Sequence, residues 1–332
     1  MADSLVRPAF ALLALAAGSA LLGSGCSEGG GDGDGARRIA VIPKGTTHEF
    51  WKSIHAGANK AAAELGVEIL WKGPVREDDR DDQIKVVEDF ISRGVDGIVC
   101  APLDDRALVR PLKDAAGEGI PVVVVDSSVD WDGSISFVAT DNHRGGVLAA
   151  RRLGALLEGE GTALVMRYQE GSASTMKREA GFLETMAAEF PGIEIVSSGR
   201  YGGATVESAY KTAENLLVSF AEVDGIFCPN ESTTFGMLRA LQDAKRAGAV
   251  RFVGFDAGEK LVEALRRGEL HGLVLQDPMA MGELGVRAIV DHLAGAPVEK
   301  RIDTGAVVVT PDDVDDPAMV RLHSPDLSKW LE

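Results

Sequence analysis

The chain has 332 residues, of which 45% are hydrophobic and 5% aromatic, and its formal net charge is −17. This length is enough for two domains of roughly 150 residues each, and the composition is that of a globular protein. No part of the chain gathers lysine and arginine into a basic block. We therefore expect no nucleic-acid partner, because phosphates are bound by clustered cations.

The first 26 residues predict an export signal. Arg7 precedes an apolar run over residues 9–22, which is too short to span a bilayer and has the length of a signal-peptide core. Small residues and Cys26 follow, an ending that resembles a bacterial lipobox, in which the cysteine receives lipid. We expect a lipid-anchored protein in the periplasm or on the outer face of the cytoplasmic membrane. An ordinary secreted protein is the alternative.

The lipobox departs from its usual pattern at one position. Gly23 stands where a leucine is usual, and Leu22 lies one position earlier. The next segment, SEGGGDGDGA over residues 27–36, is rich in glycine and acidic residues. Such a composition cannot pack into a core, so it predicts a flexible tether between the signal segment and the folded part of the chain.

From residue 37 onward, predicted strands and helices alternate. The strands of the first half read IAVIP, VEILW, GIVC and PVVVVD, and helical segments separate them. Thr46 and Glu49 have the spacing of a capping box at a helix start. The acidic run EDDRDD over residues 77–82 suits a helix N-terminus, where negative charge is favoured.

The second half repeats this scheme with the strands TALVMRY, IEIVSSGRY, GIFCPN, VRFVGFD, HGLVLQ and AVVV. The phrase VDGIVCAP at residues 95–102 returns as VDGIFCPN at residues 223–230, which indicates two similar lobes. The alternation predicts an α/β fold with two doubly wound parallel sheets. Cys100 and Cys228 end equivalent strands. We expect two buried thiols there, since a disulfide between them would lock the lobes together.

Candidate binding residues follow the predicted strands, because ligands of open α/β sheets bind beyond the carboxyl ends of the strands. These residues are Lys44, Asp126, Arg167, Tyr168, Tyr201, Asn230, Glu231, Asp256 and Gln276. Carboxylates accept hydrogen bonds from hydroxyls, and guanidinium and amide groups donate them in pairs. Phe50 and Trp51 offer flat apolar faces, although packing within a helix is the alternative for both. A polyhydroxylated ring needs this combination.

The chain resembles the sugar-binding type 1 periplasmic binding proteins, close to the ribose-binding group. The resemblance runs from about Arg38 to Val309 and rests on HEFWKSIHAGA, VDGIVCAPLD, PVVVVDSS, ATDNHRGG, KREAGF, FCPNES, VGFD and VLQDP. It implies that the sugar is contacted by Phe50, Trp51, Asp126, Asn230, Asp256 and Gln276. It also implies a monomer that needs no cofactor and works with an ABC transporter permease.

The resemblance further implies a three-crossing hinge near Thr140, Gln276 and Thr304, about which the lobes close on ligand. The N-terminal lobe should then comprise residues 37–140 plus 277–303. The C-terminal lobe should comprise residues 141–276 plus 305–332.

Several positions depart from the family pattern, so ribose is not the expected ligand. The family's sugar-binding arginine falls on Met176, and Arg178 matches a family arginine that usually lies outside the pocket. Lys44 replaces a small polar residue and His48 an asparagine. Lys44, His48 and Arg167 would suit a sugar acid or another anionic polyol, although these groups also bind neutral hydroxyls. The predicted ligand-binding set is Lys44, His48, Phe50, Trp51, Asp126, Arg167, Tyr201, Asn230, Asp256 and Gln276.

The predicted function is capture of a sugar or sugar-like polyol for an ABC importer. The alternative is a sensor that feeds a chemoreceptor or a histidine kinase. A repressor of the same fold would need a helix-turn-helix before the first lobe, where this chain has its signal segment. No enzyme is expected, because GxSxG, P-loop and HExxH motifs are missing from the sequence. No metal site is expected either, because the sequence has no CxxC spacing.

Overall fold

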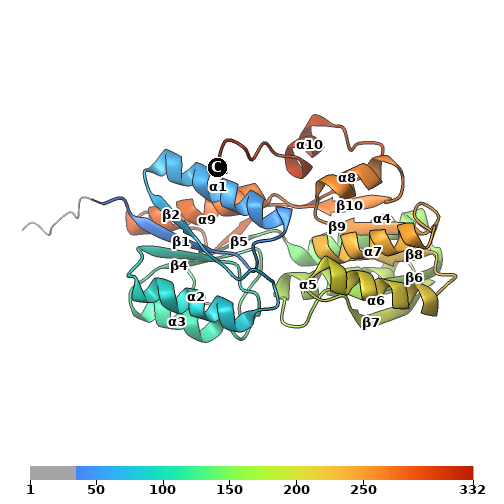
Figure 1. The fold of residues 1–332 in the computed structure, drawn as a ribbon, viewed down its shortest axis with the longest axis horizontal. Coiled ribbons are helices and arrows are strands. Elements are labelled where there is room, and N and C mark those ends of the chain that lie inside the picture. Colours follow the sequence, from blue (N-terminus) through green and yellow to red (C-terminus); the bar gives the residue numbers. More distant parts are fainter. Residues whose placement is uncertain (1–34, 332) are drawn as a thin grey trace, which may run out of the picture. The chain divides into compact units, whose positions relative to one another are not determined.

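Two six-stranded sheets form the framework of residues 35–331, the part of the chain that the structure, a computed structural model, describes. The predicted signal peptide, Cys26 and most of the tether lie outside these residues. From Ala36 onward the chain forms one compact unit. Strands and helices alternate through both sheets (Figure 1), as the sequence predicted.

The first sheet is parallel throughout. Its spatial order is β11 (Arg301–Asp303), β5 (Ser136–Ala139), β4 (Val122–Val125), β3 (Gly97–Cys100), β1 (Arg38–Ile42) and β2 (Glu68–Trp71). The central strands are short apolar runs because both faces of the sheet are covered. Ile39 and Val41 pack on one side, against α1 (Glu49–Leu65) and α9 (Pro278–Leu293). Ala40 and Ile42 pack on the other, with α2 (Arg80–Ser92) and α3 (Val109–Gly117).

The second sheet repeats this plan. Its order is β12 (Val307–Val309), β10 (Gly272–Leu275), β9 (Arg251–Phe255), β8 (Gly225–Phe227), β6 (Glu160–Arg167) and β7 (Gly192–Tyr201). Only β12 runs antiparallel to its neighbour among these strands. One face is covered by α4 (Asn142–Leu156) and α5 (Ala173–Glu189). The other is covered by α6 (Val206–Ser219), α7 (Glu231–Asp243) and α8 (Glu259–Arg266). We call each sheet with its covering helices a lobe.

One helix pair in each lobe packs with its backbones in contact. Gly57 is the ninth residue of α1, and a Cβ there would overlap the carbonyl oxygen of Met279 in α9. Gly181 is the ninth residue of α5, and a Cβ there would overlap the carbonyl oxygen of His143 in α4. Glycine is required at both places, because any side chain would push the paired helices apart.

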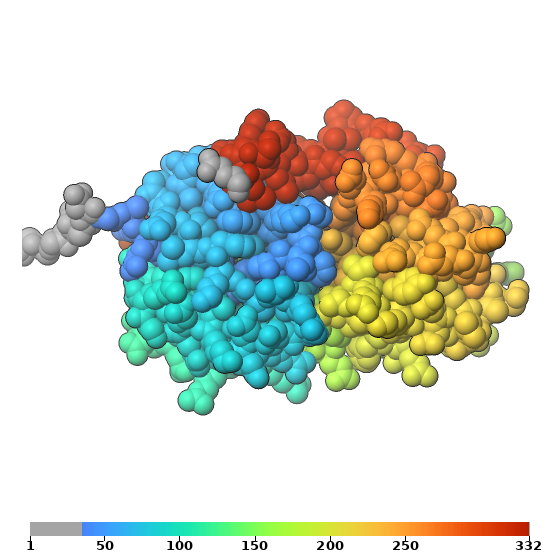
Figure 2. Space-filling view, in the orientation of Figure 1, coloured from blue at the N-terminus to red at the C-terminus, as the bar shows by residue number. Residues whose placement is uncertain are grey.

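The chain crosses between the lobes at β5–α4, at β10–α9 and at β11–β12. Two of these crossings touch, because the hydroxyl of Thr140 donates a hydrogen bond to the carbonyl of Gly305 at 2.9 Å. After α10 (Pro317–His323), the chain returns to the first lobe, where Asn59 Nδ2 donates to the Trp330 carbonyl at 2.7 Å. In Figure 2 this red segment reaches the light-blue surface of α1. The predicted placement of residues 305–332 in the C-terminal lobe did not include this return.

The start of α1 differs from the prediction. The helix begins at Glu49, and His48 occupies its N-cap position without a capping hydrogen bond from its side chain. The predicted capping box at Thr46 is therefore wrong. The first backbone N–H groups of α1 instead donate to Glu231 of the second lobe, from Glu49 at 3.3 Å and from Phe50 at 3.2 Å. A partner distant in sequence therefore takes the place of a local cap.

Two other local predictions are confirmed. The acidic run does begin a helix, because Asp79 caps α2 by accepting from the backbone N–H of Asp82 at 3.0 Å. Cys100 and Cys228 are free, buried thiols in separate core clusters. Burial raises the pKa of Cys100 to about 12, so this thiol stays protonated and unreactive. Between residues 35 and 331, none of the helices combines the length and apolar character needed to cross a bilayer.

Candidate functional site

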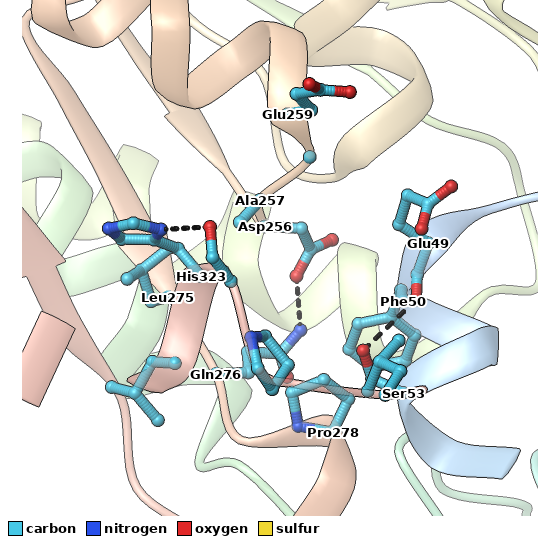
Figure 3. A pocket seen from close by; sticks show the side chains of 15 residues that line it. Glu49, Phe50, Ser53, Asp256, Ala257, Glu259, Leu275, Gln276, Pro278 and His323 are labelled. Atoms are coloured by element: carbon cyan, nitrogen blue, oxygen red, sulfur yellow. Dashed lines mark hydrogen bonds between the residues drawn. The ribbon is translucent and has the colours of Figure 1, made fainter. Parts of the chain in front are cut away.

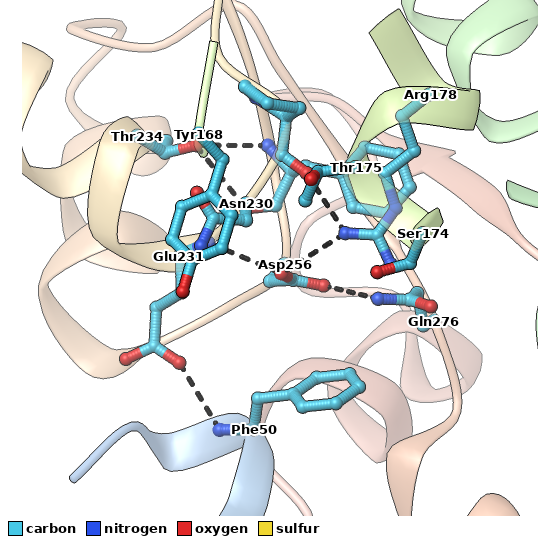
Figure 4. Close-up of polar contacts among 12 residues, drawn as sticks. Phe50, Tyr168, Ser174, Thr175, Arg178, Asn230, Glu231, Thr234, Asp256 and Gln276 are labelled. Carbon is cyan, nitrogen blue, oxygen red and sulfur yellow. Dashed lines mark hydrogen bonds and ion pairs between the residues drawn. The ribbon is translucent and has the colours of Figure 1, made fainter. Parts of the chain in front are cut away.

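Two neighbouring cavities lie between the lobes. The larger has a volume of about 180 Å³ and is bounded by the start of α1, the β9–α8 loop and the C-terminal residues after α10 (Figure 3). The smaller has a volume of about 30 Å³ and is the more polar of the two in its side chains (Figure 4). Phe50, Asp256 and Gln276 line both cavities. We call the smaller one the first cavity and the larger one the second cavity.

The first cavity brings together eight of the ten residues predicted to bind ligand. They are Lys44, His48, Phe50, Trp51, Asp126, Asn230, Asp256 and Gln276. Arg167 and Tyr201 are not among its lining residues. Arg167 turns toward the edge strand β7, where its Nη1 lies 3.4 Å from the hydroxyl of Tyr201. Tyr201 is 36% exposed and lines an outer groove between β7 and α6, so neither side chain has the place expected from its strand end.

Seven further residues line the first cavity: Glu77, Tyr168, Ser172, Ser174, Thr175, Arg178 and Glu231. Tyr168 and Glu231 follow strands, which is a signal that the sequence does carry. Glu77 lies in the acidic run, where nothing distinguishes it from its neighbours. The residues of α5 carry no such signal in the sequence, because the second lobe comes close to the first lobe only when the chain is folded.

Arg178, and not position 176, is the basic residue of α5 at this site. Positions 174, 175 and 178 lie three and four residues apart, so they face the same side of α5. Met176 is turned away from that side and does not line the cavity. The expectation that Arg178 lies outside the pocket is therefore wrong.

Asp126 and Asp256 occupy equivalent points of the two lobes. Each directly follows a buried apolar strand, and each has a left-handed backbone, with φ of 58° and 66°. The backbone N–H of Asp126 donates to Val138 at 3.1 Å, and that of Asp256 donates to Val274 at 2.9 Å. Non-glycine residues adopt this conformation at a cost in energy, and such residues gather at functional sites. The left-handed backbone at both positions directs one carboxylate from each lobe into the cavity.

Arg178 lies between these two carboxylates. Its guanidinium nitrogens are 3.7 Å from Asp126 and 3.7 Å from Asp256, and its side chain is 2% exposed. The group stacks on the ring of Phe255 at 3.9 Å, and its Nε donates to Asn142 at 2.7 Å. These contacts hold the planar guanidinium group in place, so Arg178 is a rigid hydrogen-bond donor that links both lobes.

Lys44 extends from the first lobe to the second. Its Nζ lies 2.8 Å from the Asp126 carboxylate and donates to the hydroxyl of Ser174 at 2.9 Å. The ammonium is thus balanced by a carboxylate of its own lobe. The contact with Ser174 is one that only a closed arrangement of the lobes allows.

Glu77 is the centre of a second buried ion pair. Its carboxylate pairs with His48, and it accepts from Trp51 Nε1 at 2.6 Å and from the hydroxyl of Tyr168 at 2.5 Å. Burial opposes both charges, yet their attraction prevails: the pKa of His48 is raised to about 9 and that of Glu77 is lowered to about 2. Because Tyr168 belongs to the second lobe, this network also spans the lobes.

The remaining carboxylates are less readily ionised. Burial raises the pKa of Glu231 to about 7 and raises that of Asp256 above its usual range, although Arg178 opposes the rise at Asp256. Asp256 Oδ1 accepts from Gln276 Nε2 at 2.6 Å. The other side-chain atom of that amide, Gln276 Oε1, is buried and has no partner within the described residues. It is an acceptor ready for a ligand hydroxyl.

Comparison with known proteins identifies the family. A model of the periplasmic binding protein domain matches residues 39–297, and the chain belongs to this family. It is 29% identical over 283 residues to the D-ribose/D-allose-binding protein of Pseudomonas aeruginosa, a match that covers 82% of this chain and 87% of that protein.

Solved structures agree with this assignment. An ABC transporter solute binding protein from Agrobacterium vitis with bound D-fucose is 36% identical, with a TM-score of 0.83. A second one from the same organism, bound with alpha-D-tagatopyranose, is 32% identical, also with a TM-score of 0.83. Each match covers 86% of this chain and 99% of the other.

The family consists of non-enzymatic, sugar-binding solute-binding proteins of ABC importers that work outside the cytoplasm. The predicted type 1 fold, the predicted binding function and the expectation that the chain is not an enzyme are therefore confirmed.

Proposed function

We propose that the first cavity binds a neutral sugar, which the protein carries to an ABC transporter permease. The observation behind this proposal is the charge balance of the cavity wall. Lys44 pairs with Asp126, His48 pairs with Glu77, and Arg178 lies between Asp126 and Asp256. A sugar acid would need a cation that no carboxylate of the protein neutralises. Each of these three cations has a carboxylate beside it. The anionic ligand considered from the sequence is thus not the one proposed.

In this proposal, the sugar's hydroxyls take the place of water between fixed polar groups. Asp126 and Asp256 accept hydrogen bonds from hydroxyls on opposite sides of the ring, and Arg178 donates to ring or hydroxyl oxygens between them. The Gln276 acceptor gains the partner that it lacks. Phe50 and Trp51, whose rings meet edge to face at 4.9 Å, supply apolar surface for the C–H faces of the sugar.

Lobe boundaries near Thr140, Gln276 and Thr304 are part of the proposal, as are closure about these points and attachment through lipid on Cys26. Support for closure comes from the contacts that join the lobes around the cavity. These include the Lys44–Ser174 and Glu77–Tyr168 hydrogen bonds. An open form would expose these buried groups to water.

Calorimetry tests the ligand class directly. The probes are D-ribose, D-allose, D-tagatose and D-fucose, together with D-galacturonate as the acid of matched size. We expect at least one neutral sugar to bind, and to bind at least tenfold more tightly than the acid. Tighter binding of the acid would contradict the proposal, as would failure of every neutral sugar to bind.

A further inference from the structure

We propose that the second cavity is a subsite for a neutral substituent on the bound sugar, so that the natural ligand is a glycoside or a short oligosaccharide. This inference rests on the proposed function of the first cavity. The second cavity has a volume of about 180 Å³ against about 30 Å³ for the first, and the two share Phe50, Asp256 and Gln276 in their linings. The binding region thus continues beyond the first cavity, on the side of the C-terminal segment.

The boundary between the cavities is made of groups that a ligand can rearrange. Gln276 is held there by one side-chain hydrogen bond, from its Nε2 to Asp256 Oδ1, while its Oε1 has no partner in the described structure. A sugar hydroxyl that donates to Asp256 takes the place of that amide. Gln276 is then free to turn toward the second cavity and to bond a group bound there, which satisfies an acceptor that is otherwise buried alone.

The lining of the second cavity selects the chemistry of the substituent. It contains the carboxylates of Glu49, Asp256 and Glu259, and among its lining residues there is no lysine or arginine. A phosphate or carboxylate substituent would therefore be repelled. Hydroxyl groups of a substituent can donate to the oxygens of Ser53 and Ser324, which line the same cavity and are themselves hydrogen-bonded to the Glu49 carbonyl and to His323.

Apolar surface completes the lining. Leu275, Leu322 and Leu327 face the cavity from three separate segments of the chain, and Phe50 contributes a ring at the boundary. A sugar ring has C–H faces as well as hydroxyls, so a mixed lining of this kind suits a second ring or an aglycone.

The outer wall of the second cavity is the C-terminal segment, Ser324, Pro325 and Leu327. The hydrogen bond from Asn59 to the Trp330 carbonyl holds this segment against α1 (Figure 2). A substituent in the second cavity would therefore contact this segment.

Calorimetry on the full chain tests the subsite. Each free sugar of the panel above is compared with its α- and β-methyl and phenyl glycosides. We expect at least one glycoside to bind about tenfold more tightly than its free sugar. Ser324→Trp, which fills the second cavity from its wall, should remove that gain. Lys329→Trp is the matched control, because Lys329 is exposed in the same segment and does not line the cavity; it should keep the gain.

The outcomes separate this inference from the function on which it rests. If a free sugar binds and no glycoside of it binds more tightly, the subsite is wrong and the proposed function stands. A gain that survives in Ser324→Trp, with the variant's melting temperature unchanged, also overturns the subsite. If neither free sugars nor glycosides bind, the proposed function fails and the subsite fails with it.

Discussion

At the scale of single residues, the site depends on charged groups that are buried and paired. Asp126 and Asp256 carry the same backbone strain, and Arg178 lies at an equal distance from both. Strained residues of this kind persist only where the surrounding structure holds them. Each lobe thus fixes the direction of its own carboxylate through its own backbone hydrogen bonds, and the lobes need not close for this.

Replacing Asp256 with asparagine should weaken sugar binding by about tenfold or more. Asparagine keeps one oxygen acceptor and places an amide donor where Asp256 has its second oxygen, so one of the hydrogen bonds accepted by Asp256 is lost. An unpaired buried polar group costs roughly 1–3 kcal/mol. Calorimetry with whichever panel sugar binds the native protein measures the effect. Asp130→Asn, at an exposed position, is the control and should bind like the native chain. Native affinity in Asp256→Asn would place the site elsewhere.

The His48–Glu77 pair should make stability depend on pH. The pKa of His48 is raised from 6.5 to about 9 in the folded state, so the folded state holds a proton that the unfolded state has lost. The contribution of His48 is complete below pH 6.5 and is lost as the pH rises through 9, by at most about 1.4 kcal/mol per pH unit. Urea unfolding should show this fall in the native chain, and a flatter profile in Glu77→Gln.

A surface pair provides the control for that measurement. Glu184 pairs with His143 at 2.8 Å, but both side chains are largely exposed. Glu184→Gln should therefore keep the native profile between pH 6.5 and 9. A native profile in Glu77→Gln would mean that this pair does not hold the proton on His48.

At the scale of elements, the two lobes are built on the same helix contact. In each lobe, the helix after the first strand packs against a helix that has just crossed from the other lobe: α1 against α9, and α5 against α4. Gly57 and Gly181 allow that packing at the same helical position. The crossing segments are therefore anchored at their helix starts, and bending is left to the short connections between strand and helix.

Gly57→Ala and Gly181→Ala should each lower the free energy of unfolding by about 1–3 kcal/mol. The added methyl group meets a backbone carbonyl of the paired helix, and overpacking of this kind has costs in that range. Chemical denaturation measures the change. Gly117→Ala is the control, because a Cβ there meets nothing within 4 Å and alanine favours the helix. Equal free energies of unfolding in all three variants would mean that the paired helices can move apart with no loss of stability.

The elements and the site differ in how far the sequence predicts them. The run at Val122–Val125 is apolar and β-branched, and its strand was predicted correctly. Arg301–Asp303 is a polar edge strand with no such pattern, so it was missed. Residues at strand ends, such as Asp126 and Gln276, were found because topology fixes where strands end. Glu77 was not, because its role depends on Trp51 and Tyr168, which reach it only after folding.

At the scale of the whole molecule, ligand should draw the lobes together. The polar groups of the first cavity come from both lobes and are satisfied across the boundary, so ligand binding and closure should be coupled. Small-angle scattering should show a smaller radius of gyration at saturating concentrations of a panel sugar that binds by calorimetry. An unchanged profile at saturation would contradict closure.

Attachment to the membrane should depend on Cys26. The proposed lipid is added to this cysteine, so Cys26→Ser should either release the protein from the membrane fraction or leave the precursor uncut. Fractionation and immunoblotting distinguish these results from the native pattern. Asp32→Asn, in the predicted tether, should fractionate as the native chain does. A mature-sized Cys26→Ser protein that remains with membranes would contradict the lipid anchor.

The matched carboxylates have a consequence for the handedness of recognition. Asp126 and Asp256 follow equivalent strands of two sheets that are built on the same plan, whereas the two sides of a sugar ring differ. Their partners differ: Asp126 pairs with the ammonium of Lys44, and Asp256 accepts from the backbone N–H of Glu231 at 3.2 Å. A sugar ring bound between the two carboxylates therefore meets a different environment at each of them, and only one orientation of the ring satisfies both. The discrimination between epimers thus depends on the side chains that break the symmetry of the two halves.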